Sequence, residues 1–394
     1  MKKGKLIMLV GLPASGKSFY AKKLSATYES HKVFSSDKYR EKLLGDVNDQ
    51  SQNGLVFETL YKDMRKYIEE GGTAILDATN CTRKSRSKAF QALGNIDCWK
   101  ECHIIPTFFN MCIDRDKKRE RTVGEEVIMK FAKCFEVPME FEGFDLIVIP
   151  GGLDFQYETE KFYPVADRMQ HFDQQNKHHK FKLGEHCSNV VEALFEADCQ
   201  YYEDITLWNA AMWHDVGKLY TQTIDEEGQG HYYCHANITA LWMLGNKQIQ
   251  EPGTALAYGK VIEAAFYAGE HMHIRDIIKS EKAIKKYKAL FGETYYNNLV
   301  KLMHCDNFGS KHNIKVLKEK YKNLKVNDIE IATGEDGTKA IYFHWSCEEV
   351  GFGEFTLYCK DGKFWADTEY MDSPLLKTFT RALMNNFVDG LEVK

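Results

Sequence analysis

The sequence predicts a multidomain protein: an α/β domain with a parallel sheet, then an all-α domain, then a small α+β module. Strand-like and helix-like segments alternate over residues 1–150, which is typical of a parallel sheet with helices on both faces. Residues 165–325 are helical in pattern almost throughout, and residues 326–394 return to short strands. A Pro-Gly-Gly break at residues 150–152 separates the first two regions.

Each expected element follows from local apolar periodicity and from its flanking turn residues. In the first domain we expect strands at 6–10, 32–35, 73–77, 100–108 and 145–149. We expect helices there at 17–27, 37–44, 53–70, 83–93, 110–119 and 124–134. In the last module we expect strands at 329–332, 340–345, 354–359 and 364–367, and a final helix at 374–388.

Composition excludes several classes of protein. The 394-residue chain is 44% hydrophobic and 28% charged, which suits buried cores and a soluble protein. No apolar run approaches the roughly 18 residues of a transmembrane helix, so we expect no membrane association. The 11 cysteines show no even spacing, which favours reduced thiols and a cytoplasmic location.

A phosphate-binding loop follows the first expected strand. Residues 11–18 read Gly-Leu-Pro-Ala-Ser-Gly-Lys-Ser, the P-loop pattern between a strand and a helix. Its backbone N–H groups and the helix N-terminus favour phosphate oxygens, the lysine reaches the β- and γ-phosphates, and the final serine can ligate Mg²⁺. ATP and Mg²⁺ are therefore expected at Gly11, Ala14, Ser15, Gly16, Lys17 and Ser18.

Charged residues near the ends of other expected strands could supply the remaining groups that phosphoryl transfer needs. Asp37 follows the second strand and could accept a proton from an attacking hydroxyl. Arg40 would share its helical face and could clamp a substrate phosphate. Arg115 and Arg119 are spaced to share a helix face, and together they could close over ATP as a lid.

These residues resemble the polynucleotide kinase family, P-loop enzymes that phosphorylate 5′-hydroxyl ends. The resemblance covers about residues 5–149 and rests on the P-loop, the Asp37–Arg40 pair, the Asp-Ala-Thr-Asn string at 77–80 and the two lid arginines. It implies Asp37 as the general base and Arg40 as the contact to the acceptor phosphate. It also implies that Lys17, Arg115 and Arg119 act on ATP.

The helical region carries histidines and aspartates at several separated points. His186 comes first, then the His-Asp-Val-Gly-Lys string beginning at His214-Asp215, then His235, and much later Asp306. Imidazole and carboxylate together suit a divalent transition metal such as Mn, Fe, Co, Ni or Zn. A bound metal lowers the pKa of its water and so supplies a nucleophile for a phosphoester.

This arrangement resembles the HD superfamily of phosphohydrolases over about residues 170–310. The resemblance implies His186, His214, Asp215 and Asp306 as metal ligands. His235 and His271 resemble positions that bind a second metal or the substrate phosphate in some members.

Together the two sites suggest the healing of nucleic-acid ends. The expected activities are an ATP-dependent 5′-hydroxyl polynucleotide kinase and a metal-dependent 2′,3′-phosphatase, acting on RNA or DNA ends, with a homodimer as one possible assembly. Two alternatives stay open. One is a kinase for a nucleoside or sugar nucleotide fused to an HD nucleotide phosphohydrolase. The other is an HD nucleotidase with a regulatory ATP-binding domain.

Overall fold

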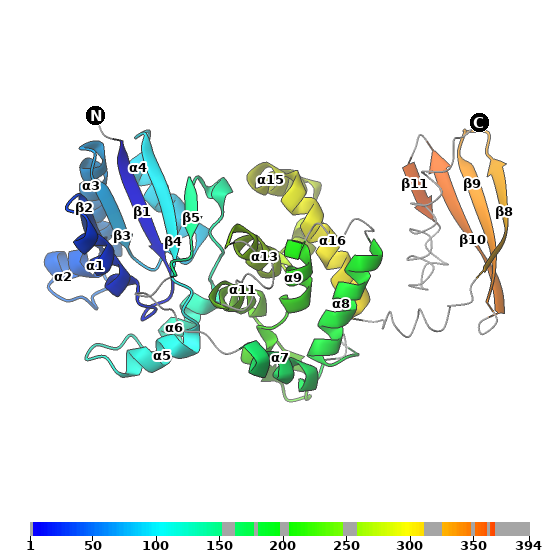
Figure 1. Cartoon of the computed structure of the whole chain (residues 1–394), viewed down its shortest axis with the longest axis horizontal. Coiled ribbons are helices and arrows are strands. Elements are labelled where there is room, and N and C mark those ends of the chain that lie inside the picture. Colours follow the sequence, from blue (N-terminus) through cyan, green and yellow to red (C-terminus); the bar gives the residue numbers. More distant parts are fainter. Residues whose placement is uncertain are drawn as a thin grey trace.

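The protein is described by a computed structural model covering residues 3–151, 162–176, 180–197, 205–246, 258–310, 325–347, 351–360 and 363–366. Figure 1 shows an α/β region, a helical region beside it, and a separate β-sheet toward the end of the chain. The helix expected at 374–388 and residues 152–161, at and after the end of the Pro-Gly-Gly break, lie outside the described residues. No helix in the described part of the chain is long and apolar enough to cross a bilayer.

A parallel five-stranded sheet forms the first domain, in the order β2-β3-β1-β4-β5. The expectation of a parallel sheet is confirmed. Because the strands run in one direction, their carboxyl ends meet along one edge. The strands are β1 (Gly4–Val10), β2 (His31–Ser35), β3 (Thr73–Asp77), β4 (Cys98–Ile104) and β5 (Leu146–Val148).

Alternating side chains of the buried strands supply two different cores. Ile7, Leu9 and Ile75 point to one face, where they pack with Ala21 of helix α1. Leu6 and Met8 point to the opposite face, which belongs to the main core of the protein. The helices of this region are α1 (Lys17–Thr27), α2 (Ser36–Leu44), α3 (Asn53–Glu69), α4 (Arg83–Leu93), α5 (Phe109–Lys117) and α6 (Glu125–Lys133).

Strand β4 is shorter than expected. It ends at Ile104, whereas the apolar run continues to Phe108. Pro106 cannot donate a ladder hydrogen bond, and Thr107 turns away to donate its hydroxyl to the Ser15 carbonyl at 2.9 Å. The apolar residues beyond the strand instead enter the core, where Phe108 is fully buried.

Among its described residues, the second region has helices and one short hairpin. A turn at Asp225–Gly228, with Gly228 at a φ of 77°, joins strands β6 (Thr223–Ile224) and β7 (Gly230–His231). The Asp225 side chain accepts the backbone N–H groups of Glu227 and Gln229, which explains why the helical pattern breaks here. The helices are α7 (Phe162–His171), α8 (Leu183–Ala197), α9 (Ile205–Trp213), α10 (Lys218–Thr221), α11 (His235–Gly245), α13 (Tyr258–Glu270), α14 (Ile274–Ile277), α15 (Glu281–Phe291) and α16 (Glu293–Gly309).

The α/β and helical regions share one buried core. Phe141 packs edge-on against Phe266 and Phe291, with ring centroids 5.6 and 4.7 Å apart. Arg83 at the start of α4 makes an ion pair with the buried carboxylate of Glu270 at the end of α13. These contacts fix the helical region against one side of the α/β region.

The final strands form an antiparallel sheet in the order β11-β10-β9-β8. Its first turn contains Gly337 at a φ of 80°, a left-handed conformation that glycine adopts without steric cost. The strands are β8 (Lys325–Thr333), β9 (Lys339–Cys347), β10 (Gly351–Lys360) and β11 (Lys363–Ala366), and each overlaps one of the expected strand ranges.

A carboxylate on β4 leads to a prediction about acid stability. Glu101 Oε1 accepts hydrogen bonds from Lys5 Nζ at 2.6 Å and Trp99 Nε1 at 2.9 Å, and Oε2 lies 3.2 Å from His103 Nε2. Burial alone would raise the pKa of Glu101, but the bonds from His103 and Lys5 outweigh it and lower the pKa to about 2. Because this value is below the ordinary one, the stabilisation is complete above about pH 4.5 and is lost as the pH falls toward 2.

We expect Glu101→Gln to lower the free energy of unfolding by about 1–2 kcal/mol at pH 7, less than the full pKa shift implies because Lys5 is partly exposed. Urea unfolding at pH 7 and pH 3 measures the effect, and the difference from wild type should shrink at pH 3. Glu126→Gln, at an exposed position on α6, is the matched control. A difference that is equal at both pH values would contradict the assigned role of Glu101.

Candidate active sites

The P-loop lies at the carboxyl edge of the central strand β1 and leads into α1. Gly16 caps this helix in a left-handed conformation with a φ of 100°, and Ala14 also has a positive φ of 61°. Lys17 is buried and donates to the Leu12 carbonyl at 2.6 Å, while burial lowers its pKa. Ser18 is exposed at the start of the helix, where its hydroxyl is accessible to a ligand. The loop therefore has the curled backbone and free helix end that phosphate binding needs.

The turn after β3 contacts the P-loop and the strand that leads into it. Asn80, at a positive φ of 49°, donates its side-chain amide to the Leu9 carbonyl at 2.8 Å. The Gly11 N–H donates to the Thr79 carbonyl at 3.0 Å. Asp77 is buried at the end of the strand. The string at 77–80 thus holds the end of β1 and the start of the loop through one side-chain and one backbone hydrogen bond.

Asp37 lies in the first turn of α2, at the carboxyl edge of β2. Its Oδ1 accepts from Arg40 at 3.0 Å and its Oδ2 from Arg121 at 3.1 Å. Arg40 is buried and also donates to Asn53 at 2.9 Å. The structure therefore brings Asp37 and Arg40 together, as the i, i+3 spacing predicts, and adds Arg121, which sequence reasoning did not single out.

The two expected lid arginines do not share a helix face. Helix α5 ends at Lys117, so Arg119 lies beyond it and approaches Asp116 at 3.5 Å. The helix stops because the buried Asp116 carboxylate accepts the backbone N–H groups of Val123 and Gly124 and so folds the chain back. Arg115 remains at the P-loop and donates to the Ser15 carbonyl at 3.2 Å.

In the helical region, six predicted residues meet around one buried point. They come from five separate segments of the chain, and all of them are buried. His214 and Asp215 are adjacent in the sequence and lie in the turn that follows α9, not within a helix. The six are His186 (α8), His214 and Asp215 (after α9), His235 (start of α11), His271 (after α13) and Asp306 (α16).

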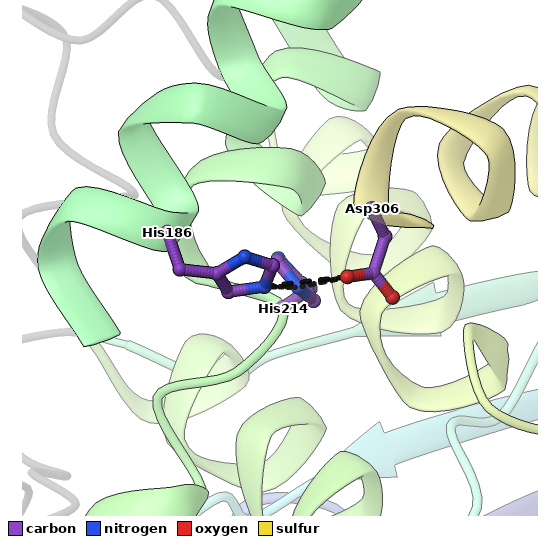
Figure 2. Close-up of side chains that lie close together, drawn as sticks. All are labelled: His186, His214 and Asp306. Carbon is purple, nitrogen blue, oxygen red and sulfur yellow. Dashed lines mark hydrogen bonds and ion pairs between the residues drawn. The ribbon is translucent and has the colours of Figure 1, made fainter. Parts of the chain in front are cut away.

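Two overlapping groups within this cluster have the geometry of metal ligands. In each group the potential ligand atoms all lie within 4.8 Å of one another. The first group is His186, His214 and Asp306, and the second is His214, Asp215 and His271. Figure 2 shows His186 and His214 directed toward the Asp306 carboxylate.

The hydrogen bonds of the imidazole rings indicate which ring nitrogen of each histidine could bind a cation. His214 Nδ1 lies 2.7 Å from the Ala211 carbonyl, and His271 Nδ1 lies 2.6 Å from that of Ala268. A carbonyl only accepts, so each of these Nδ1 atoms carries a proton, and Nε2 is the ring nitrogen that a metal could bind. His214 Nε2 then faces His186 Nε2 at 3.2 Å and Asp306 at 3.6 Å. Nitrogen and carboxylate oxygen atoms at such distances need a proton or a cation between them, and a divalent metal fits this set of potential ligand atoms.

The electrostatics of the cluster agree with that fit. Burial opposes the charged form of His214, but the Asp215 carboxylate outweighs burial and raises the pKa of His214 to about 10. Burial would raise the pKa of Asp215, yet Lys218 and His214 hold it well below its usual range. The carboxylates therefore favour a proton on His214, and a divalent cation bound at its Nε2 would replace that proton as the positive charge. Burial lowers the pKa of His271 to about 4, so this imidazole is neutral near pH 7 and free to act as a ligand.

Two cations flank the cluster. Lys218 Nζ lies 2.7 Å from Asp215 Oδ2 and donates to Gln174 at 2.8 Å. Arg275 binds Asp306 and also donates to Asn307 at 2.6 Å. Sequence reasoning missed Arg275, although its position four residues after His271 places it near the site. Both cations line a cavity of about 690 Å³ that opens onto the six-residue His/Asp cluster.

Comparisons with known proteins bear on the first domain. Residues 6–138 match a family model described as an AAA domain. Over 102 residues the chain is 33% identical to the 6-phosphofructo-2-kinase/fructose-2,6-bisphosphatase 1 of Rattus norvegicus, a match that covers 22% of each protein. The chain thus spans about a fifth of the length of this curated relative.

Solved structures are similar at lower identity. A Pnkp1/Rnl/Hen1 RNA repair complex shares 18% identity, with 42% of this chain and 54% of that chain covered and a TM-score of 0.33. A fungal RNA kinase shares 12% identity, with 39% and 78% covered and a TM-score of 0.30. Such low TM-scores carry no argument about activity. On its sequence match and its sheet, the region 6–138 is a kinase-like P-loop domain.

Proposed function

We propose that the protein heals nucleic-acid ends with two activities, an ATP-dependent 5′-hydroxyl kinase and a metal-dependent 2′,3′-phosphatase. The observation that supports this most is that one chain carries two sites. The first has a P-loop and the Asp37–Arg40 pair, and the second is a buried six-residue His/Asp cluster. One site suits transfer of a phosphoryl group and the other suits its removal. Nuclease breaks that leave a 5′-hydroxyl and a 3′-phosphate need both steps before ligation.

In the kinase step, Asp37 takes the proton of the acceptor hydroxyl, and the oxygen of that hydroxyl attacks the γ-phosphorus of ATP. The bond from the γ-phosphorus to the bridging oxygen breaks, and ADP leaves. Lys17 and the P-loop amides neutralise charge on the transferred group, and Arg40 contacts the acceptor's phosphate. Arg121 donates to Asp37 Oδ2 at 3.1 Å in the structure and so helps to orient this carboxylate.

In the phosphatase step, the residues that would hold metal are the six of the cluster. A bound metal supplies a water of lowered pKa as the nucleophile. The Nδ1–carbonyl contacts of His214, His235 and His271 orient these rings toward the cluster. Lys218 and Arg275 place positive charge beside the carboxylates, where it can bind the oxygens of the phosphoester.

The test uses an RNA oligonucleotide carrying a 5′-hydroxyl and a 3′-phosphate, incubated with the full chain, ATP, Mg²⁺ and Mn²⁺. We expect both ends to be converted, and Asp37→Asn to slow 5′ phosphorylation by about 100-fold or more with the 3′ reaction unchanged. Asp97→Asn, at an exposed surface carboxylate, is the matched control. Absence of 5′ phosphorylation by wild type would contradict the kinase assignment.

A second candidate is a kinase for a small molecule. The curated relative, named as a sugar-phosphate kinase, is the observation that favours it. This alternative expects phosphorylation of a nucleoside or sugar phosphate at a higher kcat/KM than of an oligonucleotide. A panel of such acceptors under the same conditions separates the two.

A further inference from the structure

The cavity above the metal-ligating cluster has an aromatic rim that the proposed chemistry does not use. Asp215, His235, His271 and Asp306 lie at its floor, and His231 and Tyr233 also line it. Its volume of about 690 Å³ exceeds what one phosphate group needs and lies in the range typical of small-molecule sites.

The two rim aromatics form a platform. The His231 and Tyr233 rings are parallel, with an interplanar angle of 4° and centroids 5.8 Å apart. His231 is held in place because its Nε2 lies 2.7 Å from Asp225 Oδ2 in the β6–β7 turn. Tyr233 is 70% exposed, so most of its ring is open to a ligand.

The backbone fixes this platform relative to the metal-ligating cluster. Cys234 adopts a left-handed conformation with a φ of 63°, and the chain then enters α11 at His235. His235 Nδ1 lies 2.7 Å from the Tyr232 carbonyl, while the Tyr232 hydroxyl donates to the Gln174 carbonyl. One short, braced segment thus places His235 in the cluster and Tyr233 on the rim.

Positive charge lies on the same cavity. Lys180 is exposed and lines it, and the Arg275 guanidinium lies beside Asp306. A parallel aromatic surface next to cationic side chains matches the chemistry of a nucleotide, which offers a flat base and a phosphate. A phosphoester without a ring would leave the Tyr233 surface unused.

We propose that the His231–Tyr233 platform stacks the nucleobase of the nucleotide whose 3′-phosphate enters the metal-ligating cluster. The inference rests on the proposed phosphatase function and adds the surface that would bind the base of its substrate. Stacking on Tyr233 strengthens binding of a nucleoside phosphate by about 5- to 100-fold over a base-free sugar phosphate.

The test measures binding, so its outcome does not depend on turnover. Calorimetric titration of the full chain uses adenosine 3′-phosphate and ribose 3-phosphate as probes, with ADP and Mg²⁺ saturating the P-loop. We expect Tyr233→Ala to weaken the nucleotide by about 5- to 100-fold with unchanged affinity for ribose 3-phosphate, and Tyr233→Phe to retain nucleotide affinity.

Tyr28→Ala is the matched control, because Tyr28 is also exposed and lies against a histidine, His31, in the first domain. It should leave both affinities unchanged. Equal binding of adenosine 3′-phosphate by wild type and Tyr233→Ala would overturn the proposal that the base stacks on Tyr233. Failure of the proposed phosphatase is seen separately, as a lack of hydrolysis by a wild type that binds the nucleotide.

Discussion

A Lys17→Ala variant is expected to lose ATP-dependent phosphoryl transfer by about 100-fold or more. In the structure the Lys17 ammonium lies against the Leu12 carbonyl and Ser15 hydroxyl of its own loop, within reach of phosphates that the loop would bind. Loss of this buried cation removes the charge that stabilises the transferred group. Transfer of radiolabelled γ-phosphate to an RNA with a 5′-hydroxyl measures the effect.

The controls for this variant test both its fold and the independence of the two sites. Lys22→Ala removes an exposed lysine from the same helix and should leave the kinase unchanged. Hydrolysis of a 3′-phosphate should be equal in Lys17→Ala and wild type, because the His/Asp cluster proposed to carry it out lies in the helical region. Loss of both activities in Lys17→Ala would contradict the claim that the two reactions take place in separate pockets.

Asp215→Asn is expected to lower phosphoester hydrolysis by about 1000-fold or more while sparing the kinase. The substitution keeps the shape of the side chain but removes the negative charge that lies 2.7 Å from Lys218 and 3.0 Å from His235. The affinity for a cation falls with that charge, and Lys218 is left without its carboxylate. Release of inorganic phosphate from a 3′-phosphorylated oligonucleotide measures the loss.

Asp276→Asn is the matched control for Asp215→Asn. It lies on α14 of the helical region, but its side chain is 76% exposed and pairs only at the surface with Lys279. It should hydrolyse the oligonucleotide as wild type does. Retained kinase activity in Asp215→Asn shows that the chain still folds, and hydrolysis at the wild-type rate would contradict a role for Asp215.

The features that sequence predicted well are those determined by neighbouring residues. The P-loop needs only a strand, a glycine-rich turn and a helix in succession, so its motif is complete within Gly11–Ser18. Asp37 and Arg40 meet because one helical turn separates them. The His and Asp residues of the cluster could be named only through their resemblance to the HD superfamily, because five distant segments supply them.

The features that sequence missed or misplaced depend on tertiary contacts. Arg121 reaches Asp37 across 84 positions of the chain, and no local pattern indicates that contact. Arg119 was expected on the face of α5, but the hydrogen bonds that Asp116 accepts end the helix before it. The Arg83–Glu270 ion pair joins the α/β and helical regions, so it arises only when the two regions pack together.

The metal content of the purified full chain tests the account most directly, because the cluster's role as a metal centre underlies the second activity. After incubation with Mn²⁺ and gel filtration at neutral pH, mass spectrometry should find tightly bound metal in wild type and in Lys17→Ala. Asp215→Asn should retain little of it. Equal metal content in wild type and Asp215→Asn, or none in wild type, would contradict the account.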